Sequence, residues 1–312
     1  METLYGKRNL NDWMLKQINE LFRMNYQCYH YEQLTSFEGI KKLIDDKEFD
    51  CVYAVDEGRI VGFAGFYLRT IESDLVQECL LAHLLVDKSY RGRGLGTMLE
   101  ECRLNILNQE RVERVIYASC VERPKNSIYM KLNRQFFING FRYEYRNVAQ
   151  RKENAVILIN TASVNKSQMI SVSGISEMTK KLLKRGNPNI LFSSDIEVES
   201  CYRILINKDE KIGRIVGRIV SDELSFHRIS EIVLPKNFDN EYISIYVRPS
   251  IKGYGNIDRF LISQRFYPIC YIPYIKDYYG VVEYQFLPDG IEGVLRDDNV
   301  SYEGKEFLKI YA

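Results

Sequence analysis

The chain of 312 residues lacks the features that mark a membrane-bound, secreted or nucleic-acid-binding protein. It has no run of 18 apolar residues, so we expect no membrane-spanning helix. Its start, Met-Glu-Thr-Leu-Tyr-Gly-Lys-Arg, has no apolar core of the kind found in a signal peptide. Lys and Arg (43) nearly balance Asp and Glu (42), and a net charge of +1 gives no reason to expect nucleic acid or an acidic membrane as a partner. We therefore expect a cytoplasmic protein.

Histidine and cysteine are too few and too scattered to indicate a metal site. There are three histidines and seven cysteines, and the cysteines stand at positions 28, 51, 79, 102, 120, 201 and 270. They are odd in number and lie mostly inside apolar runs, which indicates reduced core residues with neither disulfides nor a zinc framework. With 46% hydrophobic and 27% charged residues, the composition is that of a globular protein, long enough for two domains.

The most informative segment is an apolar run followed by a basic, glycine-dense turn. Residues 79–86, Cys-Leu-Leu-Ala-His-Leu-Leu-Val, are typical of a buried strand. The turn Arg91-Gly-Arg-Gly-Leu-Gly-Thr97 leads into a segment with apolar residues at helical spacing. A strand, a glycine-rich turn and a helix together point free backbone N–H groups at an anion, and the glycines let the backbone come close to a phosphate. This segment therefore predicts a phosphate-binding loop.

The spacing of the turn distinguishes it from two common phosphate loops. It is neither Gly-x-x-x-x-Gly-Lys-Ser/Thr nor Gly-x-Gly-x-x-Gly after a first strand. Arg91-x-x-Gly94-x-Gly96, preceded by Val-Asp-x-x-Tyr, resembles the acetyl-CoA pyrophosphate loop of the GNAT family of N-acetyltransferases. The alternative is a solvated basic turn without a ligand. The resemblance implies a set of acetyl-CoA-binding residues, which comprises Leu84, Leu85, Val86, Arg91, Gly92, Arg93, Gly94, Leu95, Gly96, Thr97 and Asn126.

The elements predicted for the first half occur in the order of that fold. They are a helix through residues 15–22, a helix after the capping box 35–38, a hairpin of strands 51–55 and 60–68, the strand 79–86, a helix at about 95–109, a strand at 114–120, a helix from 126 that ends at Asn139-Gly140, and strands at 141–145 and 155–159. The resemblance thus implies an α/β (α+β) fold over residues 1–162, with a mixed, mainly antiparallel sheet flanked by helices.

The second half, residues 163–312, follows a short polar stretch at 161–168 and is predicted as a second α+β domain. A helix at 176–185 precedes strands at 202–206, 212–220 and 242–247, a helix that runs into a strand over 257–268, and a strand at 281–286. The hairpin and the helix–strand pattern of the first half recur, which suggests a degenerate GNAT-like module. An unrelated α+β domain is the alternative. Because it has no Arg-x-x-Gly-x-Gly, this half is not expected to bind CoA in the same manner. It is expected to shape the acceptor site.

The candidate catalytic residues each have a structural alternative. In the family a tyrosine acid often lies four residues before the Gly-Phe that ends the helix, and this count from Gly140 gives Phe136, which has no hydroxyl. Tyr129 lies two turns earlier and could be the acid or a packing residue. His83 could be the general base or a core histidine. Glu122 could be a carboxylate base or a solvated loop charge. Glu78, at the start of the loop strand, is a weaker candidate base.

These observations predict an acyl-CoA-dependent N-acyltransferase. The chain would transfer an acetyl group from acetyl-CoA, its co-substrate, to an amine of a small molecule or peptide by direct attack, without a metal. Cys120 has no histidine near it in sequence, so a Cys-His nucleophile is not indicated. Two alternatives remain: a non-catalytic acetyl-CoA-binding module, or an acyltransferase whose donor is an acyl-carrier protein. The protein would be a monomer or a homodimer.

Overall fold

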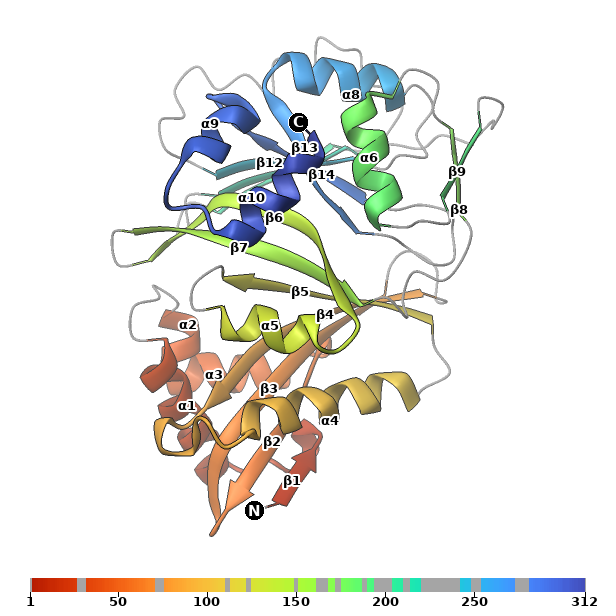
Figure 1. The fold of residues 1–312 in the computed structure, drawn as a ribbon. Coiled ribbons are helices and arrows are strands. Elements are labelled where there is room, and N and C mark those ends of the chain that lie inside the picture. Colours follow the sequence, from red (N-terminus) through yellow and green to blue (C-terminus); the bar gives the residue numbers. More distant parts are fainter. Residues whose placement is uncertain are drawn as a thin grey trace. The chain divides into compact units, whose positions relative to one another are not determined.

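The computed structural model describes most of the chain and divides it into two compact units, Met1–Ser119 and Cys120–Ala312 (Figure 1). The described residues are 2–26, 32–70, 76–109, 113–121, 125–148, 151–160, 168–171, 175–186, 190–193, 204–209, 214–219, 242–247, 254–272 and 281–311. The boundary that the sequence predicts between residues 162 and 163 stays a prediction. Within the described ranges, no helix is both long enough and apolar enough to span a bilayer.

The first unit is built on a sheet in which every neighbouring pair but one is antiparallel. Its strands lie in the order β1-β2-β3-β4-β5, and only β4 and β5 run parallel. Its elements are β1 (Glu2–Tyr5), α1 (Asp12–Asn25), α2 (Glu32–Thr35), α3 (Phe37–Asp45), β2 (Phe49–Asp56), β3 (Arg59–Thr70), β4 (Val76–Val86), α4 (Leu95–Gln109) and β5 (Glu113–Val121). A mixed, mainly antiparallel sheet flanked by helices was predicted, and this prediction is confirmed.

Two hydrophobic clusters hold the helices against the sheet. One joins α1 and α3 to side chains of β2, β3 and β4, with Phe22, Phe49 and Phe63 fully buried in it. The other joins α4 to β2 and β3, with Leu95 and Leu99 at its centre. A Cβ at Gly62 of β3 would lie 2.7 Å from Leu99 Cδ1, so the missing side chain lets α4 approach the sheet.

Local signals in the sequence explain where these elements begin and turn. The Asn11 side chain accepts a hydrogen bond from the N–H of Met14 at 3.0 Å and caps α1. Helix α3 begins one residue later than the capping box predicted, since Ser36 is the cap and its Oγ accepts from Gly39 N at 3.1 Å. The hairpin between β2 and β3 turns through Glu57 and Gly58, both with positive φ, as its two-residue loop requires.

The second unit contains a sheet whose strands lie in the order β7-β6-β13-β14-β12-β11-β10, with helices packed on it. Its elements are α5 (Asn126–Leu132), β6 (Phe136–Val148), β7 (Arg151–Asn160), β8 (Gln168–Ser171), α6 (Glu177–Gly186), β9 (Ile190–Ser193), β10 (Ile204–Asp209), β11 (Arg214–Ile219), β12 (Tyr242–Val247), α8 (Tyr254–Ser263), β13 (Phe266–Ile272), β14 (Val281–Phe286), α9 (Gly290–Arg296) and α10 (Tyr302–Leu308). Strands β8 and β9 form a separate parallel pair.

The pairing pattern of the first unit recurs in the second. Strand β11 is antiparallel to β10 and parallel to β12, as β4 is antiparallel to β3 and parallel to β5. This order agrees with the hairpin repeat that the sequence indicates. Of the turn predicted at 207–211, residues 207–209 belong to β10 and the remainder lies outside the described residues.

A helix–strand joint occurs twice in the second unit. Helix α5 ends at Leu132 and α8 ends at Ser263, and each is followed by a residue with φ above 60°, Gln135 or Arg265, directly before β6 or β13. Residues 126–137 and 256–267 show the same succession of exposed, half-buried and buried positions. The strands β6 and β13 pair antiparallel at Gly140 and Cys270.

The predicted end of the helix at Asn139-Gly140 is wrong. Both residues lie inside β6, and the backbone turns in the left-handed region at Gln135 instead. A Cβ at Gly140 would lie 2.6 Å from Cys270 Sγ, so this glycine serves a close contact between strands and does not end a helix.

Candidate functional site

In the part of the chain that the structure describes, a group of backbone N–H donors in the turn before α4 has no protein partner. Gly92 and Gly94 have φ of 75° and 82°, which glycine adopts at little cost. Among the described residues, no acceptor takes the backbone N–H groups of residues 92–97, and Met98 N is the first to bond, to Gly94 O at 3.0 Å. A Cβ built on either glycine meets no atom within 4 Å, so the space in front of the turn is open. Free N–H groups at the start of a 15-residue helix can bind an anion.

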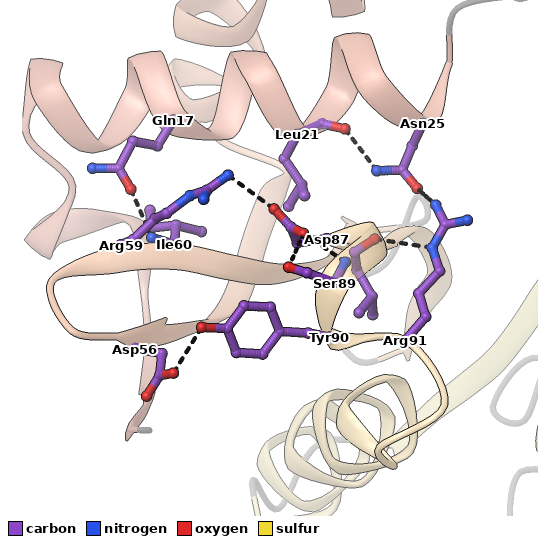
Figure 2. A network of polar contacts seen from close by, with 11 residues as sticks. Gln17, Leu21, Asn25, Asp56, Arg59, Ile60, Asp87, Ser89, Tyr90 and Arg91 are labelled. Atoms are coloured by element: carbon purple, nitrogen blue, oxygen red, sulfur yellow. Dashed lines mark hydrogen bonds and ion pairs between the residues drawn. The ribbon is translucent and has the colours of Figure 1, made fainter.

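Asp87 fixes the start of this turn at the end of β4 (Figure 2). Its Oδ1 accepts hydrogen bonds from the N–H of Ser89 at 2.9 Å and from the Ser89 hydroxyl at 2.6 Å. Its Oδ2 accepts from the Arg59 guanidinium at 2.9 Å. The hydrogen bond from the Ser89 hydroxyl, with the nearby positive charge of Arg59, holds the pKa of Asp87 below its usual value. Asp87 is therefore ionised and ties the turn to the hairpin between β2 and β3.

Arg91 and Tyr90 anchor the turn on two further elements (Figure 2). The Arg91 guanidinium donates to Asn25 Oδ1 at 2.6 Å and to the Val86 carbonyl at 3.3 Å, which joins the turn to the end of α1. The Tyr90 hydroxyl donates to Asp56 Oδ2 at 2.8 Å. Arg93 lies 5.5 Å over the Tyr90 ring and keeps a second positive charge at the turn. These contacts hold the backbone of the turn in one conformation.

Strand β4 separates from β5 and then carries a bulge opposite β3. Phe63 pairs with Leu85 and Gly65 with Ala82, so two residues of β4 lie opposite Ala64. Pairing with β5 ends at Leu81 and Ala118, although β4 continues to Val86. We call residues 82–86 of β4, which have no pairing with β5, the fork segment. The backbones of β4 and β5 therefore separate from residue 82 onward.

His83 lies at the bulge in a strained backbone conformation. Its φ of 52° is uncommon for a residue other than glycine, and a backbone of this kind costs about 1–3 kcal/mol. The half-buried imidazole contacts two hydroxyls, with Tyr26 OH 3.4 Å from Nδ1 and Tyr67 OH 3.5 Å from Nε2. The rings of Phe22 and Phe49 lie at 5.4 and 6.2 Å from it. His83 is therefore on the α1 side of the sheet, between two tyrosines and next to the buried rings of Phe22 and Phe49.

The other residues predicted along the acyl arm point to different sides of β4. Leu85 is buried in the cluster with α1 and α3, whereas Leu84 and Val86 pack against the α4 cluster. Leu95 is also buried, so only its backbone is available to a ligand. Gly96 and Thr97, in the first turn of α4, are half-buried. The structure thus brings the predicted residues 84–86 and 91–97 together around the fork segment and the turn.

Asn126 and Tyr129 lie on α5 in the second unit. Asn126 is exposed, and Tyr129 is 47% exposed with its hydroxyl donating to Glu303 Oε1 at 2.9 Å. The Lys125 ammonium lies 2.7 Å from Glu303 Oε2. Burial of Glu303 acts to raise its pKa, but the hydrogen bonds from Lys125, Tyr129 and Ser301 outweigh it and lower the pKa to about 2. No sequence pattern indicated this contact, because Glu303 belongs to helix α10, which was not predicted.

Because α5 ends earlier than predicted, the count that locates the family's tyrosine acid reaches a different residue. Phe136 is buried at the start of β6, and its ring lies 5.9 Å from the Lys131 ammonium. Since Gln135 is the left-handed residue after the helix, a count of four residues back from it reaches Lys131 and not Phe136. Lys131 is almost fully buried. Glu122 lies outside the described residues, and Glu78 lies in β4 near its start.

A buried ion pair on α4 was missed by the sequence reasoning. The side chains of Glu100 and Arg103 are almost fully buried and contact one another. Arg103 NH1 also donates to the carbonyls of Gly65 at 2.7 Å and Ala82 at 3.0 Å. Two charges three residues apart on a helix usually indicate a solvated face, so the sequence offered no signal for burial. Over the described ranges, no group of three His, Cys, Asp or Glu side chains is placed to hold a metal ion.

Comparison with known proteins gives one family match and several similar folds. The model of the acetyltransferase (GNAT) family matches residues 15–132. Three solved structures illustrate the similar folds. They are Arabidopsis thaliana NAA60 with a bisubstrate analogue (14% identity, 51% of this chain and 97% of that chain, TM-score 0.43), ribosomal-protein-alanine N-acetyltransferase from Brucella melitensis (17%, 51% and 99%, 0.44) and the aminoglycoside 6'-N-acetyltransferase from Enterococcus faecium (17%, 51% and 96%, 0.40).

The matched segment contains every element around the turn and the fork segment. It begins within α1 and ends with α5, so it includes β4, the turn and α4. The resemblance that the sequence indicates is therefore confirmed for residues 15–132, which match the model of the acetyltransferase (GNAT) family.

Proposed function

We propose that this protein is an N-acetyltransferase that uses acetyl-CoA and acetylates an amine of a small molecule or a peptide. The observation that carries the proposal is the set of free backbone N–H groups at residues 92–97, open to the outside and flanked by Arg91 and Arg93. These groups suit a pyrophosphate, since an anion gains both the donors and the positive end of the α4 dipole. The family match over residues 15–132 supports the same donor.

The fork segment supports the position of the thioester. A strand that leaves its neighbour exposes backbone N–H groups to a ligand, and such groups can bind the oxyanion of a tetrahedral intermediate. Because Leu84, Leu85 and Val86 lead directly to the turn, the pantetheine arm would follow them from the pyrophosphate to the bulge. Asn126 is a further residue that we propose to contact acetyl-CoA.

His83 is the candidate base that the geometry favours. It lies at the bulge, its imidazole is half-buried, and tyrosine hydroxyls lie 3.4 and 3.5 Å from its two ring nitrogens. A base takes the proton of the attacking amine and contributes about 10²–10⁴ in rate. The amine would attack the thioester directly. Glu122 and Tyr129 stay alternative candidates for proton transfer.

A non-catalytic acetyl-CoA-binding module is the second candidate. Neither of the two positions counted for the family's tyrosine acid, Phe136 and Lys131, is a tyrosine. Calorimetric titration with acetyl-CoA, followed by release of free CoA thiol over a panel of amines, separates the two. Binding with amine-dependent thiol release supports the transferase. Binding without release for any amine supports the binding module, and absence of binding contradicts both. An acyl-carrier-protein donor would show as thiol release from acyl-phosphopantetheine protein but not from acetyl-CoA.

A further inference from the structure

Arg103 contacts the backbone next to the bulge in the fork segment. Its side chain is 1% exposed and that of Glu100, its ion-pair partner on the same helix, is fully buried. Burial of a charge is costly unless it is paired and hydrogen-bonded, so this arrangement needs a compensating contact. That contact is to the main chain, because Arg103 NH1 donates to Gly65 O at 2.7 Å and to Ala82 O at 3.0 Å.

The two carbonyls belong to a pair of residues next to which the pairing of β4 with both of its neighbouring strands becomes irregular or ends. Gly65 and Ala82 are partners on β3 and β4, and along β4 they form the pair directly before the register shift. Ala82 is also the first residue of β4 beyond the last pairing with β5, at Leu81 and Ala118. A single guanidinium therefore binds the last regular pair before the bulge and the first residue of the fork segment.

The contact with Ala82 also sets the direction of the next amide. The Ala82 carbonyl and the His83 N–H belong to one planar trans peptide group, in which they point in opposite directions. Since the carbonyl is held by Arg103 on α4, the His83 N–H points away from that helix. The guanidinium thus fixes the orientation of a peptide group at the point where the acetyl thioester is proposed to lie.

We propose that Arg103 is a positioning residue that orients the Ala82–His83 peptide group and thereby the hydrogen bonds that the thioester carbonyl of acetyl-CoA receives at the fork segment. This inference rests on the proposed function. Arg103 does not touch the substrate. Helix α4 begins at the pyrophosphate turn and carries Arg103 in its third turn, so one rigid element positions both ends of the donor.

The test measures, by NMR, the ¹³C chemical shift of acetyl-CoA that is labelled at its acetyl carbonyl carbon. Hydrogen bonding of this carbonyl changes its ¹³C shift, and the full-length wild type should therefore show a bound shift that differs from free acetyl-CoA. The double variant Glu100→Gln with Arg103→Met removes both charges, so no lone buried charge remains. It should bind CoA as the wild type does, because the turn is untouched, but lose most of the carbonyl shift.

Two further variants keep the test decisive. Glu100→Gln alone retains the guanidinium and its two carbonyl contacts, and it should keep the wild-type shift. Arg103→Lys keeps the ion pair but lacks the planar fork of donors, and it should lose part of the shift even if the double variant does not fold. With an amine that the wild type accepts, the double variant should lower kcat by about 10²-fold, the effect of one misplaced oxyanion donor, without raising the KM for acetyl-CoA.

The outcomes separate this inference from the proposed function. Absence of acetyl-CoA binding by the wild type would overturn the proposed function and the inference together. Binding by the wild type without any carbonyl shift would overturn the inference alone. So would a full wild-type shift in a folded Arg103→Lys or double variant, because a residue that only stabilises the fold would leave the bound carbonyl unchanged.

Discussion

Arg142 of β6 donates two hydrogen bonds to Glu283 Oε2 of β14, at 2.9 and 2.7 Å, and both side chains are almost completely buried. The same guanidinium donates to the Tyr246 hydroxyl of β12 at 3.2 Å. Three strands from different parts of the second unit thus share one buried ion pair. Strands β6 and β7 therefore depend on residues far downstream for their packing.

Removal of one partner of this pair should destabilise the protein strongly. We expect Glu283→Leu to lower the free energy of unfolding by about 3–5 kcal/mol, since the Arg142 charge would remain buried without its partner. The double change Arg142→Met with Glu283→Leu should recover most of the loss. Urea unfolding measures both. Glu292→Gln, in an exposed pair with Arg296, is the matched control and should change stability by less than about 0.5 kcal/mol.

The predicted domain boundary at 162/163 can be tested by truncation. A chain of residues 1–162 keeps β6 but loses β13 and β14, and it leaves Arg142 and the Asn139 amide without their partners Glu283 and Tyr271 O. We expect this fragment to show no cooperative unfolding transition, in contrast to the full chain. A sharp thermal transition of the fragment would instead support an independent first domain.

Acid should weaken the contact between α10 and α5. A carboxyl whose pKa is lowered on folding stabilises the fold above its unfolded pKa and loses this contribution as the pH falls through the folded value. For Glu303, with a pKa of about 2, that window runs from about pH 5 to pH 2. Glu303→Gln should lower the free energy of unfolding by about 2–3 kcal/mol at pH 7 and by progressively less toward pH 2. Chemical unfolding at each pH measures this difference.

The control for this effect is Glu306→Gln on the same helix, because Glu306 forms an exposed pair with Lys309. It should show no such pH dependence. An equal pH dependence in both variants would contradict a specific role of the Glu303 contact.

Gly96→Val should remove acetyl-CoA binding and leave the fold intact. A Cβ at this position lies 3.7 Å from Val86 Cγ2, an ordinary contact, but a larger side chain would stand among the free N–H groups of the turn. Gly94→Val should also remove binding but cost about 1–2 kcal/mol of stability, because its φ of 82° is left-handed. Calorimetric titration and thermal unfolding measure the two effects. Retained wild-type affinity in Gly96→Val would contradict the placement of the pyrophosphate.

His83→Asn should lower turnover by about 10²–10⁴-fold if the imidazole is the base, without changing the affinity for acetyl-CoA. Asparagine tolerates the left-handed backbone at this position, so the variant separates chemistry from strain. Tyr67→Phe, which removes a hydroxyl 3.5 Å from Nε2, should have a much smaller effect. Steady-state kinetics with an accepted amine provides the measurement. Wild-type turnover in His83→Asn would move the base to another residue.

Periodicity and turn chemistry predicted most of the first unit. The hairpin at 56–59, the strand before the turn and the helix from 95 follow from local signals that the structure retains. The bulge at His83 could not be predicted, because it depends on how β3 and β4 pair. The helix end was wrongly predicted at Asn139-Gly140 for a similar reason. Gly140 is needed for the close contact with Cys270, which lies far away in sequence. The left-handed residue Gln135 carries no local signal.

The repeated joint at Gln135 and Arg265 has a consequence for assembly. Each copy of the joint directs a strand, β6 or β13, into the shared edge at Gly140 and Cys270. Because the two strands belong to one chain, their edge forms at the high effective concentration that the connecting residues impose.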